Sequence, residues 1–139
     1  MHSTTDYPHQ ALTRTIIGGF YEVYNALGSG FREIVYQRAL AIALTERGLD
    51  VEREVPMTVF FHQRSVGTFR ADLVVGCSVL LELKALPELQ PSHVAQIINE
   101  LRATRLEVGL LLNFGPTPQI KRLIAGQRDT DSADRHRAR

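Results

Sequence analysis

Two carboxylates and a lysine lie within a short, otherwise apolar stretch of the sequence, residues 70–84. Two apolar runs of strand length flank a Gly-Cys-Ser segment there, which predicts a β-hairpin. A three-residue loop sets Asp72 directly across from Glu82, with Cβ atoms about 5 Å apart. Because residues two apart along a strand share a face, Lys84 joins Glu82 on the side that carries Asp72.

These residue types in this arrangement point to metal-assisted chemistry. Two facing carboxylates repel each other, and burying a charge is costly unless the charge is paired or bound to a metal. A divalent cation removes the conflict, and all-oxygen ligands suit Mg²⁺ or Mn²⁺. Lys84 is then placed to hold or activate a water molecule, or to stabilise charge on a phosphoryl group.

A plain surface hairpin is the alternative interpretation of the same stretch. In that case one face lies in water, and the two acids form surface ion pairs with Lys84 or Arg70. Val74 and Leu80 share the face of the acids, so that face is not a simple solvated one. Apolar residues on both faces predict a covered, central hairpin.

Two helices are predicted ahead of the hairpin, at about residues 12–27 and 31–47. Gly28 and Gly48 follow them as natural helix terminators. The Gly-Gly pair at positions 18–19 weakens the first helix but permits close packing against a neighbour. Apolar residues cover most of the circumference of the second helix, so this helix is expected to be buried on several sides.

Glu33 lies near the start of the second helix and has two interpretations. With Gly30 as the N-cap, Glu33 occupies position N3, where an acid caps backbone amides and suits the helix dipole. Alternatively, the stripe of Tyr36, Leu40 and Leu44 begins at Glu33. In that case Glu33 points inward, as a further metal ligand beside the hairpin acids.

The remaining elements complete a mixed sheet. Antiparallel strands are predicted at residues 51–61, 66–75 and 79–85, followed by a helix at 91–104, a strand at 107–113 and a short helix at 118–125. The fourth strand is continuously apolar and follows a helix, so it joins the third strand in parallel through a right-handed crossover. The order αα-βββ-α-β-α predicts an α/β fold with a mixed α+β sheet.

The predicted helix at 91–104 carries uncharged polar residues along one side. His93, Gln96 and either Asn99 or Glu100 form that stripe, and such groups suit a phosphate, a base edge or a metal-bound water. An ordinary solvent-facing stripe is the alternative interpretation, although Lys and Glu are more usual on such a face.

The composition is that of a single globular domain. The chain has 139 residues, of which 44% are hydrophobic and 22% are charged. We expect a flexible N-terminus at 1–10, one domain at 11–126 and a disordered tail at 127–139. No apolar run reaches membrane-spanning length, the start lacks a secretory pattern, and the single Cys77 excludes an internal disulfide. A cytoplasmic location is therefore the default expectation.

Net charge is +1, and its distribution limits what can be inferred from it. Removing the four Arg and three Asp of the tail leaves 12 basic and 12 acidic residues at positions 1–126. Bulk charge therefore does not predict a nucleic-acid binder, although it leaves room for a local basic groove.

The hairpin motif resembles that of a known nuclease superfamily. Asp72, followed on the next strand by Glu82-Leu83-Lys84, matches the Asp…(Asp/Glu)-X-Lys signature of the restriction-endonuclease-like, or PD-(D/E)XK, superfamily. The context adds to the match, because a helix acid precedes the hairpin and a helix with a glutamine follows it. The resemblance implies a restriction-endonuclease-like core.

A closer resemblance is to a small bacterial family named for its Gly-X-X-Glu-X-X-Tyr (GxxExxY) motif. That motif runs here from Gly30 to Tyr36, and the similarity covers about residues 16–124. Family members often carry His at the position of Tyr24 and an aromatic residue near Glu100. These two departures affect substrate contacts or support of the site more than they affect the acid pair.

The resemblance implies a metal-dependent nuclease that hydrolyses phosphodiester bonds in DNA or RNA, with Mg²⁺ or Mn²⁺ as its cofactor. The metal ligands would be Asp72, Glu82, Glu33 and the backbone carbonyl of Leu83. The catalytic residues would be Asp72, Glu82, Lys84, Glu33 and Gln96, and the substrate-binding residues His93, Arg70, Tyr36 and Asn99.

Two other hypotheses fit the same residues. The first is a catalytically inactive module on this fold that binds nucleic acid or protein. The second is a structural oligomer in which Glu33, Asp72, Glu82 and Lys84 form a buried ion network. The sequence leaves the choice of DNA or RNA open, and it leaves both a homodimer and a larger protein partner open.

Overall fold

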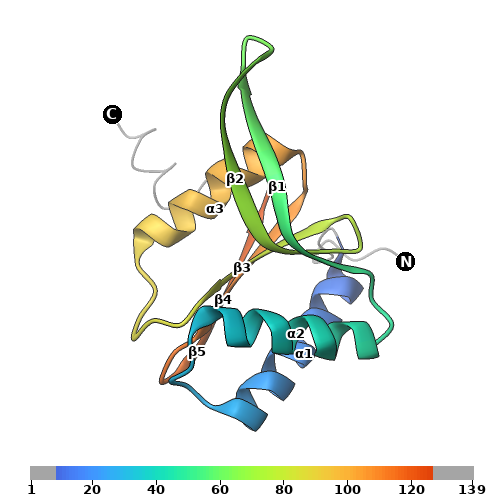
Figure 1. Cartoon of the computed structure of the whole chain (residues 1–139), viewed down its shortest axis with the longest axis vertical. Helices are drawn as coiled ribbons and strands as arrows, with labels where there is room; N and C mark the ends of the chain where they lie inside the picture. Colours follow the sequence, from blue (N-terminus) through green and yellow to red (C-terminus); the bar gives the residue numbers. More distant parts are fainter. Residues whose placement is uncertain (1–8, 127–139) are drawn as a thin grey trace, which may run out of the picture.

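The computed structural model describes residues 9–126 (Figure 1). Its elements are α1 (Gln10–Leu27), α2 (Glu33–Glu46), β1 (Val51–Phe61), β2 (Arg64–Val75), β3 (Val79–Lys84), α3 (Pro91–Thr104), β4 (Val108–Phe114) and β5 (Pro118–Ile124). The expected flexible start at 1–10 overlaps α1 at Gln10; positions 1–8 and the expected disordered tail at 127–139 lie outside the described residues. None of the described helices is long and apolar enough to cross a membrane.

The five strands of residues 9–126 form one sheet, in the order β1-β2-β3-β4-β5. Adjacent strands pair antiparallel except β3 and β4, which pair in parallel and are joined through α3. The expected parallel pairing of the third and fourth strands is therefore confirmed. The three-residue loop of the central hairpin is also confirmed, because Val75 pairs with Val79.

Helices cover both faces of this sheet (Figure 1). The α1 and α2 layer packs against one face, which includes Leu81 and Leu83 of β3. Helix α3 packs against the other face, over Val74, Leu80 and Leu111. The central strands need apolar residues on both sides, which explains their continuous apolar sequences. The covered hairpin is thus confirmed, with Val74 4% and Leu80 0% exposed.

The predicted final helix at residues 118–125 is wrong, because this segment is strand β5, antiparallel to β4. Ile120 and Leu123, three residues apart, would lie on one side of a helix. In the strand they face opposite layers, Ile120 toward α1 and α2 and Leu123 toward α3. The edge of β4 offers backbone hydrogen-bonding groups that need partners, and this outweighs a short local helical pattern.

Helix α2 begins later than predicted. It starts at Glu33, so this residue is at N1 rather than N3, and Gly30 lies ahead of the helix instead of capping it. The hydroxyl of Tyr36 donates a hydrogen bond of 2.6 Å to the carbonyl of Gly28 and accepts one of 3.1 Å from the N–H of Phe31. These bonds hold the preceding turn in a non-helical conformation.

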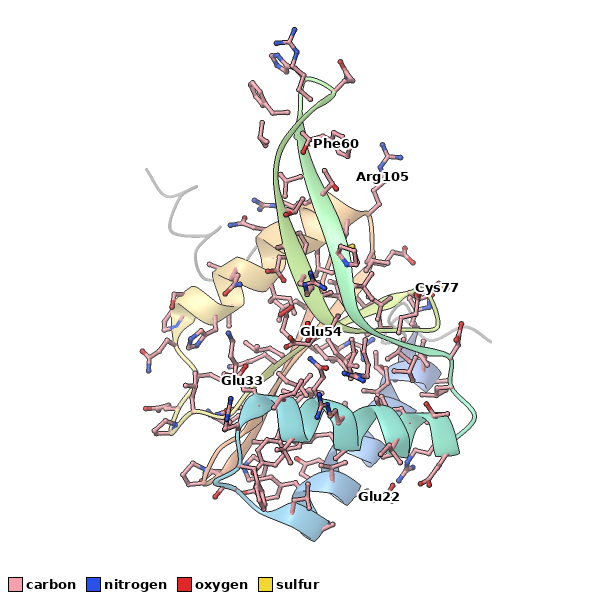
Figure 2. All side chains as sticks on the ribbon, in the orientation of Figure 1. Glu22, Glu33, Glu54, Phe60, Cys77 and Arg105 are labelled. Carbon is pink, nitrogen blue, oxygen red and sulfur yellow. The ribbon has the colours of Figure 1, made fainter. Side chains whose placement is uncertain are left out.

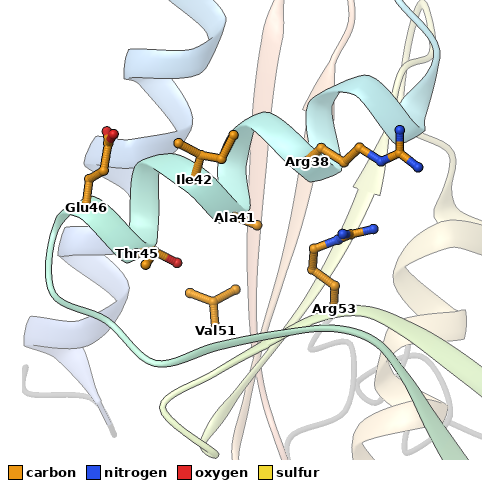
Figure 3. Close-up of a pocket in the computed structure, with 7 residues that line it drawn as sticks. All are labelled: Arg38, Ala41, Ile42, Thr45, Glu46, Val51 and Arg53. Atoms are coloured by element: carbon orange, nitrogen blue, oxygen red, sulfur yellow. The ribbon is translucent and has the colours of Figure 1, made fainter.

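Burial of α2 is also narrower than predicted. Tyr36, Leu40 and Leu44 are fully buried along one stripe, whereas Ile42 is 60% exposed. The outer side of α2 and the start of β1 border an open pocket of about 520 Å³ (Figure 3), lined by Arg38, Ala41, Ile42, Thr45, Glu46, Val51 and Arg53. The expectation of burial on several sides is therefore wrong: within residues 9–126, α1 and the sheet cover the inner side of this helix and leave its outer side exposed.

Close packing between α1 and α2 provides a stability test at the glycine pair. A Cβ atom at Gly19 would lie 2.5 Å from Cδ2 of Leu44, which is fully buried and has no free space to move into. A Cβ atom at Gly18 would lie 3.2 Å from the flexible guanidinium of Arg47.

We expect Gly19→Ala to lower the free energy of unfolding by about 1–3 kcal/mol through overpacking. The matched control Gly18→Ala should raise it by up to about 1 kcal/mol, because alanine favours the helix. Urea unfolding followed by circular dichroism measures both values. Equal effects of the two substitutions would contradict this account of the helix contact.

Candidate functional site

Asp72 lies where the central hairpin opens. The ladder between β2 and β3 ends at the pair Leu73–Leu81, one residue before Asp72. Beyond that point, Oδ2 of Asp72 accepts a hydrogen bond of 2.7 Å from the backbone N–H of Leu83. The carboxylate therefore substitutes for a main-chain partner, and this bond fixes it beside the segment that carries Glu82.

Glu82 is a buried acid, only 8% exposed, on the central strand β3. Burial raises the pKa of Glu82 to about 9; the charges of Asp72 and Glu100 add to the increase, and Lys84 opposes it. Within the described part of the chain, Oε1 of Glu82 has no hydrogen-bond partner. At neutral pH this carboxyl is therefore protonated unless a cation joins it.

A small acidic cavity of about 200 Å³ lies beside Asp72. Its lining residues are Glu33, Ile34, Gln37, Glu54, Asp72 and Leu83. Burial raises the pKa of Asp72, the Leu83 N–H opposes this, and the charges of Glu33 and Glu54 raise it further. Glu33 is exposed at the start of α2, and Glu54 comes from β1 (Figure 2). The fold thus gathers three carboxylates around one cavity.

Glu54 is a residue of this cavity that the sequence did not reveal. It adopts a left-handed backbone conformation, with φ of 54°, and the pairing of β1 with β2 skips it. Its Oε2 accepts a hydrogen bond of 2.6 Å from Nε2 of Gln37 on α2. A left-handed non-glycine residue stores strain and is often found at functional sites. Neither strand periodicity nor residue type predicts this conformation.

A second acid, Glu100, approaches Glu82 from α3. It is 7% exposed, and its Oε2 accepts a hydrogen bond of 3.2 Å from Nε2 of Gln96. Burial raises the pKa of Glu100, and side-chain hydrogen bonds with Gln96 and Glu82 partly offset this effect. The sequence offered Glu100 as an alternative to Asn99 on the polar stripe of this helix and as a departure from a family pattern, and the predicted site residues included Asn99 instead.

Of the other predicted site residues, His93 and Tyr36 have polar atoms engaged within the fold, whereas Arg70 and Asn99 are exposed. His93 takes part in a capping box at the start of α3, where its Nδ1 accepts a hydrogen bond of 2.9 Å from the N–H of Gln90. Tyr36 is fully buried, with its ring stacked on Phe114 at a centroid distance of 4.3 Å. Its expected role in substrate binding does not fit this position, because no part of the ring or hydroxyl reaches the surface.

Arg70 and Asn99 are exposed and thus accessible to a ligand. The Nε atom of Arg70 lies 4.0 Å from Oε1 of Glu54, which links this arginine loosely to the acidic cavity. Asn99 is on α3, and no hydrogen bond or ion pair within residues 9–126 ties its side chain to the site.

The donor set fits a hard divalent cation in part. Carboxylate and carbonyl oxygens are the ligands that Mg²⁺ prefers, and this ion usually keeps several waters and binds through one or two carboxylates. The Glu82 oxygen has no partner among residues 9–126, and a cation beside it would lower the raised pKa values of Glu82 and Asp72. In residues 9–126, no three His, Cys, Asp or Glu side chains converge as a ready-made metal site.

Comparison with known proteins assigns the chain to a superfamily. A family model described as the PD-(D/E)XK nuclease superfamily matches residues 10–123, so the chain belongs to that superfamily. The fold observed here is consistent with the restriction-endonuclease-like architecture that was expected.

A solved structure shares the fold. The crystal structure of SSO0001 is similar with a TM-score of 0.55 and 15% sequence identity, over 94% of this chain and 66% of that one. This chain therefore spans about two thirds of the length of that protein, and the likeness concerns the fold alone. No curated protein sequence matches this chain.

The raised pKa of Glu82 makes stability depend on pH. Its ordinary pKa is 4.5 and its value in the folded state is about 9, so the folded chain binds this proton more tightly than the unfolded chain. The contribution of Glu82 to stability is therefore complete below about pH 4.5 and is lost as pH rises toward 9.

We expect metal-free Glu82→Gln to be more stable than the wild type by about 1–4 kcal/mol at pH 9, because no buried charge forms. The difference should fall to near zero at pH 4. Thermal unfolding in chelator across this pH range measures the effect, with the exposed Glu88→Gln as a charge-matched control. A wild type that is as stable as the Glu82 variant at pH 9 would disprove the assigned burial of charge.

Proposed function

We propose that this chain is a metal-dependent nuclease that hydrolyses phosphodiester bonds in DNA or RNA, and that it belongs to the GxxExxY family within its superfamily. The observation that carries the proposal is the buried Glu82 carboxyl beside Asp72, with one oxygen unpartnered in the described chain and Lys84 close by. Strongly perturbed acids of this kind gather at functional sites more often than elsewhere. Membership of the nuclease superfamily supports the same conclusion.

Asp72, Glu82 and the carbonyl of Leu83 would hold Mg²⁺ or Mn²⁺, and Glu33 at the cavity rim is placed to add a ligand or to hold a metal-bound water. When bound, such an ion would polarise the scissile phosphate and lower the pKa of a water molecule. With that positive charge present, Asp72 and Glu82 can both stay ionised at neutral pH.

Lys84 is a positively charged side chain close to the three acids of the site. It is half-buried, and its charge opposes the rise in the pKa values of Asp72, Glu82 and Glu100 that burial causes. An ammonium group in this position orients the attacking water and stabilises charge that develops on the phosphate. Gln96 is bound to Glu100 on α3 and is exposed, which suits it to position a nucleotide.

A nucleic-acid-binding module without catalysis is the second candidate. The observation that favours it is the position of Glu100 beside Glu82. Together with Asp72 it adds a third carboxylate, and therefore more repulsion, at the centre of the site. Such a site binds a proton readily, and this competes with binding of a cation.

Substitution of the central residues tests catalysis directly. Asp72→Asn and Lys84→Ala should each reduce cleavage of labelled DNA or RNA in Mg²⁺ or Mn²⁺ by about a hundredfold or more, because each removes charge that stabilises the transition state. Matched controls are Asp50→Asn, an exposed acid, and Lys121→Ala, the other lysine of the sequence and also exposed. A wild type that cleaves neither nucleic acid, or variants that cleave normally, would refute the nuclease proposal.

Metal binding is tested without reference to activity. At a Mn²⁺ concentration one hundred times Kd, the free energy of unfolding of the wild type should rise by about 2.7 kcal/mol. Asp72→Asn should show much less of this increase, and Asp50→Asn should show all of it. Differential scanning fluorimetry with and without chelator measures the shift. No shift in the wild type would favour the structural ion network, in which the acids bind no metal.

A further inference from the structure

The hairpin of β1 and β2 continues well beyond the rest of the sheet and projects from the body as an arm (Figure 1). Strand β2 pairs with β3 only from Leu73 to Val75, whereas its pairing with β1 continues to Phe61–Arg64. Val55 and Met57 still pack beside the α3 layer. Residues 58–68, here called the arm, lie beyond that contact.

The end of the arm exposes large apolar side chains. Phe60, Phe61 and Val66 are 64%, 62% and 61% exposed (Figure 2 labels Phe60). Phe61 and Val66 share the face that carries Arg64, whereas Phe60 lies on the opposite face. Exposed apolar side chains that lie together on one face suit contact with a ligand.

One face of the tip combines an aromatic ring with a cation. His62 and Gln63 both have positive φ, 49° and 61°, as in a two-residue type I′ turn. The ring of Phe61 stacks on that of His62, with centroids 4.0 Å apart and an interplanar angle of 13°. Phe61 pairs directly with Arg64 across the strands, so both side chains lie on the same face.

The charge along the arm complements a phosphate backbone. The arm, residues 58–68, contains Arg64 and no Asp or Glu, although the body as a whole carries equal numbers of acids and bases. Arg70 follows the arm on the same strand, with its Nε atom 4.0 Å from Oε1 of Glu54. Strand β2 runs from Arg64 through Arg70 to Asp72. At about 3.3 Å per residue, the arm tip lies about 26 Å along the strand from the acidic site.

We infer that the arm binds a single-stranded nucleic acid, with an unpaired base stacked on the Phe61 ring and a phosphate bound by Arg64. The inference deepens the proposed function and rests on it, because it takes nucleic acid as the ligand. Flat aromatic rings stack on any base, and positive side chains follow the backbone, which is how single strands are bound without sequence preference. The arm then directs the strand along β2 toward Asp72.

A second copy of the chain is the rival occupant, because exposed apolar residues also suit a protein partner. Strand addition at β1 is opposed by Pro56, which lacks the N–H that a new ladder needs. The absence of acids on the arm also favours a polyanion over another copy of a chain whose body is neutral.

Fluorescence anisotropy in chelator tests the inference, with labelled single-stranded DNA and RNA and the matching duplexes as probes. Phe61→Ala should weaken single-strand binding about 5- to 150-fold. The same substitution should weaken binding of the duplexes much less, because their bases are already stacked. Phe61→Trp should restore binding because it keeps a flat ring, whereas Phe61→Leu should not. Arg64→Gln should reduce the salt slope of log K by about one. Tyr21→Ala, which removes an exposed aromatic residue of α1, is the matched control.

Single-strand binding that is unchanged in Phe61→Ala, or fully restored in Phe61→Leu, would overturn the inference. So would a wild-type dimer in sedimentation velocity that Phe61→Ala dissociates, because the second copy would then be the occupant.

Cleavage of the same single strands in Mn²⁺ by the wild type and Lys84→Ala separates this inference from the proposed function. If cleavage depends on Lys84 but Phe61→Ala leaves binding unchanged, the inference about the arm is overturned and the nuclease proposal stands. If binding depends on the Phe61 ring but the wild type cleaves no strand, single-strand binding by the arm is supported and the nuclease proposal is overturned.

Discussion

The repulsion between the buried carboxyl of Glu82 and that of Asp72 is the constraint around which the site is built. Glu82 lies on the central strand β3, where helices cover both faces of the sheet, so the fold excludes it from water. The Leu83 N–H holds the Asp72 carboxylate in place beside the strand that carries Glu82. Burial raises the pKa of both groups; the charges of Asp72 and Glu100 raise that of Glu82 further, and the charges of Glu33 and Glu54 raise that of Asp72 further. Such carboxylates are stable in their charged forms only with a cation nearby.

Rigid elements hold the residues around this pair. Helix α2 brings Glu33 and Gln37, the irregularity in β1 turns Glu54 toward the same cavity, and α3 brings Glu100 against Glu82. The closely packed α1 and α2 layer supports one side of the sheet, which offsets the cost of gathering like charges. The arm lies outside both cores, so its exposed residues can serve binding without weakening the packing that positions the acids.

The placement of candidate site residues was predictable from sequence where a local motif fixed both type and position. The hairpin loop, and with it the closeness of Asp72 and Glu82, followed from strand length and a glycine-containing turn. Glu54 was not predictable, because neither its left-handed conformation nor its hydrogen bond from Gln37 on another element follows from the local sequence. The sequence also did not show that Nδ1 of His93 accepts a hydrogen bond in a helix cap, or that the Tyr36 hydroxyl is bonded within a buried turn.

The sequence by itself determined the strands at 51–61 and 79–84 and the helix at 91–104, because periodicity and turn residues act over a few neighbouring positions. It also determined the motif that identifies the superfamily. Only the tertiary structure decided that 118–124 completes the sheet as β5, that one side of α2 stays exposed, and that Glu33, Glu54 and Glu100 approach the hairpin acids. These features depend on which backbone groups lack partners and which faces meet across the fold, and no local pattern encodes either.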